Sequence, residues 1–395
     1  MSKVVNRVKT AIVGCGMISN IYIRNLKNLF SIIDLVGLCD LNRSAAEEKA
    51  NLYGVERVMG LDEIAQSDEI ELVVNLTGPA AHYDIIKKML DASKHVFTEK
   101  MLTTDLEKGW ELIKLADKKG LYLGAAPDTV LGAGIQTARK ALDAGLIGQV
   151  TSCLVSINRN QSLNSEVFKF LREDGGALPY DVGIYYVAAL LCLLGPVKAI
   201  RAFGRPAPVH EAQLLFQGEG GENWKIPGNN LIVGALEFQN GTLCSIHFNG
   251  NTVNAEQSTI MLYGTERLMQ LGDPNRFDGF VKLMKAETGE CFLPHTHGYN
   301  GAPVLPDPTP YDGYGHRGVG VAEMAWAMRG NRLNRCSKEY GLHSMEVLCG
   351  LDKASLTGST YEMQSTFVME PLKSGYFSTM NQGSRRGDAE LSLVE

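Results

Sequence analysis

The sequence predicts an α/β protein with a doubly wound parallel sheet in its N-terminal half. A C-terminal α+β domain with a large, open, mostly antiparallel sheet is expected to follow. The first half alternates nearly continuous apolar runs with helical segments, a pattern typical of a parallel sheet covered on both faces. Beyond residue 150 the apolar runs follow one another in hairpin-like succession, and Asn240-Gly241 is a strong two-residue turn signal. We therefore divide the chain into residues 1–127, residues 128–371 and a tail at 372–395.

The hydrophobic pattern locates the elements of both halves in chain order. The expected strands of the parallel sheet are residues 9–13, 33–39, 72–76, 95–98 and 121–125, with helices at 21–29, 44–52, 84–92 and 106–119. A helix at 134–142 is expected to join the halves. The expected strands of the second sheet are residues 150–159, 199–203, 231–238, 242–248, 258–263 and 267–271.

Length, charge and cysteine content limit the class of function. A chain of 395 residues favours two domains. A net charge of −6 without any dense Lys/Arg cluster argues against nucleic acid or an anionic membrane as partner, so we expect a small molecule. No apolar run reaches the roughly 18 residues of a membrane helix, and no export signal precedes the first strand. The eight cysteines lack Cys-x-x-Cys spacing, which indicates reduced cysteines in a cytoplasmic protein.

A glycine turn follows the first strand and opens the first helix. Gly14 allows the tight turn, Gly16 lets the backbone approach a ligand, and Ser19 is small enough for close helix-to-strand packing. The helix N-terminus offers free N–H groups to a diphosphate. The turn predicts a dinucleotide site that includes Gly14, Gly16, Met17 and Ile18.

Asp40, at the end of the second strand, supplies a second cofactor signal. It lies 21 positions after Ser19, close to the spacing of about 20 expected for the carboxylate that binds the adenosine ribose. A carboxylate there repels a 2′-phosphate and so favours NAD over NADP, whereas nearby Arg43 leaves some use of NADP open. The alternative is a solvated aspartate that ends a strand.

Two further strand ends bring a family into view: residues 75–82, Asn-Leu-Thr-Gly-Pro-Ala-Ala-His, and residues 97–101, Phe-Thr-Glu-Lys-Met. Together with the glycine turn and Asp40 they resemble the Gfo/Idh/MocA oxidoreductases, the family of glucose-fructose oxidoreductase and inositol dehydrogenase. The resemblance implies an NAD-binding Rossmann domain. It departs from the family pattern at Gly78, which intervenes before the proline, and at Met101, which replaces a proline. By this resemblance the residues that border the nicotinamide are Thr77, Pro79, His82, Glu99 and Lys100.

Lys100 is also a candidate on physical grounds. It lies at the carboxyl end of a buried parallel strand, where open α/β sheets bind ligands. Partial desolvation is expected to lower its pKa toward a useful range. The alternative is an ordinary surface lysine.

A second glycine-rich stretch, residues 174–186, carries the chemistry. Pro179 suits the first turn of a helix, and Asp181 and Tyr185 are four residues apart, so both project from one face. They read either as an acid/base pair or as a core tyrosine with an aspartate that favours the helix dipole. The family carries Gly-Gly-x-Leu-x-Asp-x-Gly-x-His/Tyr here. The chain matches this pattern at Gly175, Gly176, Leu178, Asp181, Gly183 and Tyr185.

The resemblance then implies that Lys100, Asp181 and Tyr185 surround the reacting carbon, with Tyr186 as the alternative base. We expect Tyr185, its pKa lowered by Lys100, to take the hydroxyl proton of a secondary alcohol. Asp181 would bind a neighbouring substrate hydroxyl.

Other polar residues are weaker candidates for substrate binding. Asp128 and Arg159 lie at or just after the joint between the halves, although surface roles are as plausible for both. His297, with His295, belongs to a loop at 293–310 that could close over a pocket. We predict no metal site, because this His-x-His pair lacks an identifiable third ligand.

The predicted function is NAD-dependent hydride transfer with a secondary ring hydroxyl of a sugar, polyol or glycoside. The first candidate is C3 of a glucose-type ring, giving a 3-keto sugar. The alternatives are an NAD-dependent glycosidase that oxidises its sugar transiently, and a non-catalytic NAD-binding partner protein. We expect a homo-oligomer, because the open sheet needs a cover and an ordered polar tail needs a partner surface.

Overall fold

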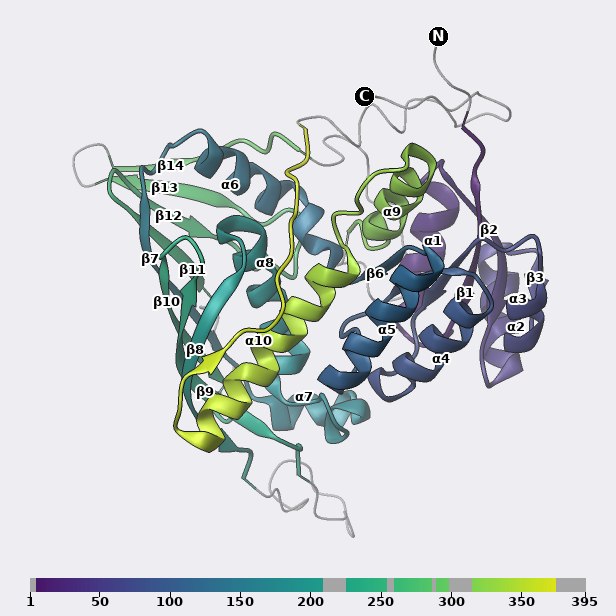
Figure 1. The fold of residues 1–395 in the computed structure, drawn as a ribbon, viewed down its shortest axis with the longest axis horizontal. Coiled ribbons are helices and arrows are strands. Elements are labelled where there is room, and N and C mark those ends of the chain that lie inside the picture. Colours follow the sequence, from purple (N-terminus) through teal and green to yellow (C-terminus); the bar gives the residue numbers. More distant parts are fainter. Residues whose placement is uncertain (1–4, 209–224, 254–258, 286–288, 298–314, 374–395) are drawn as a thin grey trace.

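The computed structural model describes residues 5–208, 225–253, 259–285, 289–297 and 315–373. These residues form two sheets with helices packed between and around them (Figure 1). The larger apolar core includes residues of both halves, among them Ile12 of the first sheet and Ile246 of the second. The predicted boundary at residue 127 stays a prediction. Most of the predicted tail, from residue 374 on, and residues 298–310 of the predicted lid loop lie outside the described residues.

The first sheet is parallel throughout and has the doubly wound order β3-β2-β1-β4-β5-β6. Its strands are β1 (Val8–Val13), β2 (Ile33–Cys39), β3 (Arg57–Val58), β4 (Leu72–Asn75), β5 (His95–Thr98) and β6 (Leu123–Ala125). The predicted parallel sheet is confirmed. Only β3, two residues long, has no counterpart among the predicted strands of this sheet.

Helices cover both faces of this sheet (Figure 1). They are α1 (Ser19–Asn28), α2 (Arg43–Tyr53), α3 (Leu61–Gln66), α4 (Pro79–Asp91) and α5 (Leu106–Lys119). Local chemistry sets their ends: Pro79 occupies the first turn of α4, and the Asp105 carboxylate accepts from the Glu107 N–H as the N-cap of α5. Gly120 ends α5 in the left-handed conformation.

The second sheet has the order β14-β13-β12-β11-β7-β10-β9-β8-β15. All its pairings are antiparallel except that of β7 with β10, so the predicted mostly antiparallel sheet is confirmed. Gly241, at φ +86°, closes the predicted hairpin between β9 and β10. The strands are β7 (Val150–Asn158), β8 (Val197–Pro206), β9 (Asn229–Phe238), β10 (Leu243–Asn249), β11 (Thr259–Gly264), β12 (Leu268–Leu271), β13 (Val281–Lys285), β14 (Gly289–Phe292) and β15 (Tyr361–Glu362).

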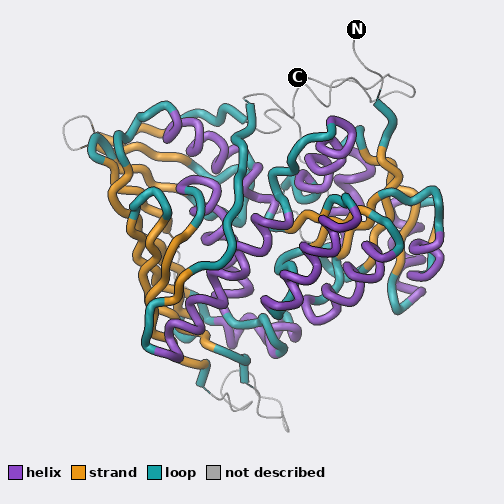
Figure 2. Tube along the Cα trace, viewed as in Figure 1, coloured by secondary structure: helices purple, strands orange, loops and turns teal. Residues whose placement is uncertain are grey.

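Helices lie on the side of the second sheet that faces the first half (Figure 2). They include η1 (Asp128–Leu131), α6 (Ala133–Asp143), α7 (Gln161–Val167), η2 (Lys169–Arg172), α8 (Ile184–Leu194) and α10 (Lys338–Thr357). A π-helical turn, η3 (Pro179–Gly183), leads directly into α8. Every residue of α8 is buried, which explains its apolar sequence from end to end.

The chain returns to the first half through α9 (Val319–Gly330), which lies beside α1 in Figure 1. Asn25 of α1 donates a 2.8 Å hydrogen bond to the carbonyl of Arg317, just before α9. Arg329 at the other end of α9 forms a 2.8 Å ion pair with Glu71 beside β4. This return brings Arg317 to the carboxyl ends of the parallel strands, where the site is predicted from the sequence.

Candidate active site

The glycine turn has the shape that a dinucleotide needs. Gly14 adopts φ +103°, and a Cβ there would lie 2.7 Å from the backbone carbon of Leu76, so only glycine fits. A Cβ at Gly16 would meet nothing within 4 Å, which leaves open space above the start of α1. Met17 is half exposed beside it, and Ile18 is the residue before α1.

Asp40 reaches from the end of β2 to this turn. One carboxylate oxygen accepts a 2.7 Å hydrogen bond from the Cys15 N–H, and the other accepts from Asn42 at 2.8 Å. Arg43 is exposed and forms a 2.9 Å ion pair with Glu47. The open space at Gly16, the start of α1 and the Asp40 carboxylate together fit a bound NAD, with its diphosphate on the turn and its ribose near Asp40.

The end of β4 contributes Thr77, Pro79 and His82. The Thr77 hydroxyl donates to the Asn75 side chain at 2.8 Å, and Pro79 begins α4. His82 is fully buried, with its ring nitrogens 2.9 Å from the Thr77 carbonyl and 2.6 Å from the Met101 carbonyl. His82 thus fixes the backbone on both sides of the predicted nicotinamide site and has no free ring nitrogen to offer a cofactor.

Glu99 is buried at the end of β5 and faces away from bulk solvent. One oxygen accepts a 2.8 Å hydrogen bond from the Tyr22 hydroxyl, and the other accepts from the Lys100 N–H at 2.8 Å. The peptide bond between Lys100 and Met101 is cis. Glu99 therefore holds the backbone that aims the Lys100 side chain.

The Lys100 side chain meets the second glycine-rich stretch. Its Nζ donates 2.9 Å hydrogen bonds to both Oδ1 and the backbone carbonyl of Asp181. The Oδ2 atom of Asp181 accepts a 3.0 Å hydrogen bond from Gln161, whose amide also donates to the Gly176 carbonyl at 3.1 Å. Asp181 lies in the π-helical turn η3, an irregularity often found at functional sites.

Tyr185 completes the cluster and is only 7% exposed. The Lys100 Nζ lies 5.8 Å from the centre of its ring, and the Arg317 guanidinium carbon lies 5.2 Å from it. Tyr186 points elsewhere, because its hydroxyl donates to Asp273 at 3.3 Å. The structure therefore brings Lys100, Asp181 and Tyr185 together and sets Tyr186 apart from them.

Two of the predicted substrate residues, Asp128 and His297, are buried and bonded to backbone groups. Asp128 is fully buried, and its Oδ2 accepts hydrogen bonds of 2.8 and 3.1 Å from the N–H groups of Gly318 and Gly320 at the start of α9. His297 is 2% exposed, and its ring nitrogen bonds the Leu372 carbonyl at 2.9 Å. Both residues thus hold backbone segments together, and substrate binding by either stays a prediction.

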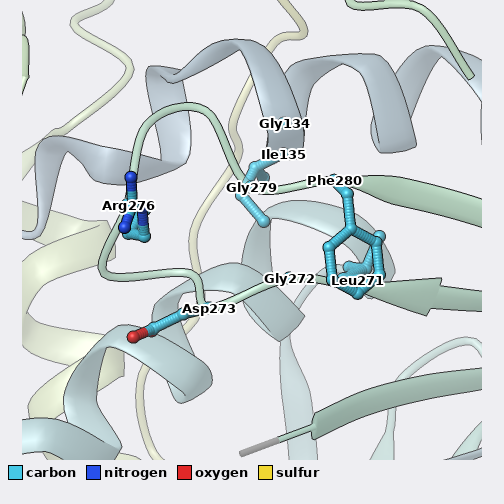
Figure 3. Close-up of a pocket in the computed structure, with 8 residues that line it drawn as sticks. All are labelled: Gly134, Ile135, Leu271, Gly272, Asp273, Arg276, Gly279 and Phe280. Carbon is cyan, nitrogen blue, oxygen red and sulfur yellow. The ribbon is translucent and has the colours of Figure 1, made fainter.

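Arg159 lies near Asp273, at the edge of a small hollow. It is 3.8 Å from Asp273, which lines a small hollow between the 272–280 loop and the start of α6. Figure 3 shows Asp273 and Arg276 on this loop, with Ile135 of α6 nearby. Asp273, which lines the hollow, accepts a hydrogen bond from Tyr186 of α8, the helix that also carries Tyr185.

Four residues of this region were not predicted: Gln161, Asp273, Asn275 and Arg317. Gln161 follows the end of β7, so the strand-end rule that located Lys100 could have found it. Arg317 sits far along the chain, and its Nη2 donates a 2.6 Å hydrogen bond to Asn275. Only the return of the chain through α9 places it at the site.

Comparison with known proteins identifies the chain. Residues 8–126 match the family described as "Oxidoreductase family, NAD-binding Rossmann fold", and residues 135–269 match the "GFO/IDH/MocA C-terminal domain". The chain belongs to the Gfo/Idh/MocA oxidoreductases. The predicted family, fold class and NAD-binding domain are confirmed.

Curated relatives of this Gfo/Idh/MocA chain include dehydrogenases and uncharacterized oxidoreductases. An uncharacterized oxidoreductase of Schizosaccharomyces pombe is 28% identical over 49% of this chain and 54% of the relative. The scyllo-inositol 2-dehydrogenase (NADP(+)) of Bacillus subtilis is 29% identical over 50% of this chain and 55% of the relative. The chain thus spans about half the length of these relatives.

Solved structures match a larger part of the chain. Levoglucosan dehydrogenase in complex with NADH and L-sorbose has a TM-score of 0.76 at 17% identity, covering 91% of this chain and 99% of that one. An oxidoreductase from Agrobacterium radiobacter in complex with NAD+, L-tartaric acid and magnesium has a TM-score of 0.74 at 14% identity, covering 90% and 98%. At these identities the similarity shows the Gfo/Idh/MocA fold.

In this Gfo/Idh/MocA chain the expected lowering of the Lys100 pKa is wrong in direction, and the expected lowering of the Tyr185 pKa by Lys100 is present but outweighed by burial. Burial lowers the pKa of Lys100, but the Asp181 carboxylate at 2.9 Å, together with Tyr185 and Glu99, outweighs it, so the pKa is raised and the ammonium is retained. Burial raises the pKa of Tyr185, and the charges of Arg317 and Lys100 offset only part of this rise. Lys100 is a fixed cation rather than a proton carrier, and Tyr185 is a phenol in the free protein.

Metal-ligating clusters and membrane-length helices are both absent from the described residues. No group of three or more His, Cys, Asp or Glu among the residues described could hold a metal ion. None of the helices described is long and apolar enough to cross a membrane.

Proposed function

We propose that this chain is an NAD-dependent oxidoreductase that transfers a hydride between nicotinamide and a secondary hydroxyl of a sugar, polyol or glycoside. The observation that carries the proposal is the meeting of Lys100, Asp181 and Tyr185 at the carboxyl ends of the parallel strands. A non-catalytic NAD-binding protein would have no reason to bring them together. When bound, NAD+ supplies the hydride acceptor.

Tyr185 is the proposed general base. Its hydroxyl makes no hydrogen bond with the residues that the structure describes, so it is available to a substrate hydroxyl. In its ionised form, after its own proton has passed to solvent, the Tyr185 oxygen takes the proton of the oxidised hydroxyl as the carbinol hydrogen leaves as hydride. Such general base assistance contributes roughly 10²- to 10⁴-fold in rate. In the direction of reduction the same oxygen returns the proton.

Lys100 and Asp181 are proposed to position the substrate and to balance charge. The Lys100 ammonium has three donors, of which two are used by Asp181, so one can meet the substrate oxygen. Both Asp181 oxygens already accept a hydrogen bond, from Lys100 and from Gln161, but each retains a lone pair for a neighbouring substrate hydroxyl. Asp181 therefore orients the ring and does not act as the base.

The proposed substrate is a neutral, hydroxyl-rich ring. The donors and acceptors at Lys100 and Asp181 suit adjacent hydroxyls. Arg159, which lies 3.8 Å from Asp273 of the hollow, is a proposed outer substrate contact. Related proteins whose names include inositol and levoglucosan fit this class. We take C3 of a glucose-type ring as the first candidate, with a 3-keto sugar as product.

The open face of the second sheet supports a homo-oligomer. Phe203 of β8 and Val233 of β9 lie opposite each other on the face away from the helices, and they are 77% and 44% exposed. Burying such side chains is the ordinary reason for association. Light scattering should show an assembly larger than one chain, and Phe203→Asp should shift it toward the monomer. We also propose a cytoplasmic location, which the eight free cysteines support.

A panel of sugars, polyols and glycosides tests the proposed activity. The purified chain is incubated with NAD+ and each compound, NADH is followed by absorbance, and the product is identified by mass and NMR. We expect NADH in proportion to a keto product, and none with Tyr185→Phe. Release of free aglycone without net NADH would instead establish the glycosidase alternative.

A further inference from the structure

Arg317 is a buried cation that the mechanism above does not use. Its side chain is 1% exposed, and it lies immediately before α9, where Asn25 binds its carbonyl. Asn275 fixes the guanidinium through a 2.6 Å hydrogen bond to Nη2. The backbone and the side chain are thus held from two different elements, so the position of the charge is well defined.

The guanidinium faces the ring of Tyr185. The Arg317 Cζ lies 5.2 Å from the ring centre, slightly closer than the Lys100 Nζ at 5.8 Å. Both distances fall within the range of cation–π contacts. Because Tyr185 and Arg317 are both buried, little water screens the interaction between them.

The two cations next to Tyr185 have different neighbours. The Lys100 ammonium donates to the Asp181 carboxylate at 2.9 Å, so a negative group already offsets much of its field. Arg317 donates a 2.6 Å hydrogen bond to the Asn275 amide, and the carboxylates of Glu99 and Asp128 also interact with its charge. Arg317 nevertheless opposes the burial of Tyr185 more strongly than Lys100 does in lowering the tyrosine pKa.

We propose that Arg317 is a positioning residue that stabilises the negatively charged tyrosinate form of Tyr185, the form that takes the substrate proton. The inference rests on the proposed function of Tyr185 and deepens it. Lys100 then serves mainly the substrate oxygen and Asp181, while Arg317 serves the base. Each of the two oxygens that exchange the proton then has its own cation: Lys100 for the substrate oxygen and Arg317 for the Tyr185 oxygen.

The charged groups around Tyr185 come from three elements, and their balance influences the pH at which its hydroxyl ionises. Arg317 before α9 and Lys100 after β5 favour the phenolate, whereas Glu99 after β5 and Asp181 in η3 oppose it. Removing Arg317 leaves one cation against two carboxylates. The tyrosinate form of Tyr185 should then require a higher pH.

The test compares the pH dependence of Arg317→Gln and Arg317→Lys with that of the unaltered chain. Tyrosinate formation is followed by ultraviolet difference absorbance in the presence of NAD+ alone, with Tyr185→Phe used to subtract the other tyrosines. We expect Arg317→Gln to raise the Tyr185 pKa by about one unit or more, since each unit is tenfold in the tyrosinate fraction below the pKa. Arg317→Lys should recover part of this shift.

Arg335→Gln is the matched control. It removes another buried guanidinium, one that is ion-paired at 2.9 Å to Glu323 of the same helix α9, so it loosens α9 without changing the charge at Tyr185. It should leave the tyrosine titration unchanged. If Arg317→Gln does not fold, Asn275→Ala frees the guanidinium and should raise the pKa in the same direction by a smaller amount.

An unchanged Tyr185 titration in the folded Arg317→Gln variant, or in Asn275→Ala if that replaces it, would overturn the inference. A shift of equal size in Arg335→Gln would overturn it too, by assigning the effect to the packing of α9. Failure of the proposed function gives a different result. In that case Tyr185→Phe retains turnover of a compound found in the substrate panel, whatever the titration shows.

Discussion

The Nζ atom of Lys100 and the Oδ1 atom of Asp181 lie 2.9 Å apart, although 81 positions separate the two residues in the chain. Lys100 lies two residues beyond the end of β5 in the first sheet, and Asp181 lies in the π-helical turn η3 that precedes α8. The pair therefore joins the half that fits NAD to the half that would hold the substrate. Its geometry raises the pKa of Lys100 despite burial, which fixes a positive charge at the junction.

Lys100→Met tests this junction. We expect kcat to fall by about 10² to 10⁴, because the substrate oxygen loses its cationic donor and Asp181 loses its partner. NADH binding, measured by fluorescence, should be retained, since the glycine turn and Asp40 are untouched. Lys87→Met, at an exposed lysine of α4, serves as the control and should keep normal turnover. Normal turnover in Lys100→Met would remove the lysine from the mechanism.

Gln161→Leu tests the positioning of Asp181. The substitution leaves the Asp181 Oδ2 and the Gly176 carbonyl without their shared donor. A hydrogen bond to a charged group contributes about 1.5–3 kcal/mol, so we expect kcat to fall by about ten- to a hundredfold. Glu166→Gln, on the exposed side of the same helix, should have no such effect. Equal rates for the two variants would show that Asp181 needs no support from Gln161.

Asp40→Ser tests the choice between NAD and NADP. Removing the carboxylate removes its repulsion of a 2′-phosphate, so we expect the ratio of NADPH to NADH affinity to rise about tenfold or more. Arg43→Ser should leave this ratio nearly unchanged, because the Arg43 guanidinium is exposed and paired with Glu47. Fluorescence titration of both dinucleotides measures the ratio without knowledge of the substrate. An Asp40→Ser variant with the original preference would assign the selectivity to another residue.

The buried carboxyl group of Asp128 is expected to make the stability of the folded chain depend on pH. Burial raises its pKa from the ordinary 3.8 to about 6, while Arg317 and the two α9 N–H groups oppose the rise. A carboxyl group with a raised folded-state pKa binds its proton more tightly in the folded chain. Its stabilising effect is therefore complete below about pH 4 and is lost as the pH rises through about 6, a change of roughly 3 kcal/mol.

Asp128→Asn should remove this dependence, since an amide oxygen can still accept from Gly318 and Gly320. Thermal unfolding of both proteins between pH 4 and pH 7.5 gives the comparison. We expect the unaltered chain to lose stability relative to Asp128→Asn as the pH rises across this window. A constant difference in Tm at all pH values would show that Asp128 does not titrate there.

The sequence predicts the first sheet well because each of its longer strands is a continuous apolar run bounded by a helix. It misses β3, which is too short for any periodicity, and it also misses β13, β14 and β15. All four residues of β14 are exposed, so no burial pattern marks it, and β15 has only two residues. Pairing with a neighbouring strand, rather than local sequence, forms these edges.

The candidate site likewise has some residues that local sequence predicts and others that it does not. The candidates Lys100, Asp181 and Tyr185 lie in motifs that can be read locally, and the structure brings them together. Gln161 follows a strand end and could have been found by the same rule, whereas Arg317 depends on the return of a distant segment, so no local pattern marks it. The pKa expectation for Lys100 considered burial but not the Asp181 carboxylate, and that for Tyr185 considered the Lys100 charge but not burial.

Hydride transfer itself tests the central claim most directly. A compound from the sugar and glycoside panel is labelled with deuterium at the carbinol carbon, and the NADH formed from NAD+ is analysed by mass spectrometry. The proposed mechanism predicts NADH that carries one deuterium with the unaltered chain, and none with Tyr185→Phe. A chain that binds NADH yet forms no labelled NADH from any member of the panel, or a Tyr185→Phe variant that forms it at the normal rate, would contradict it.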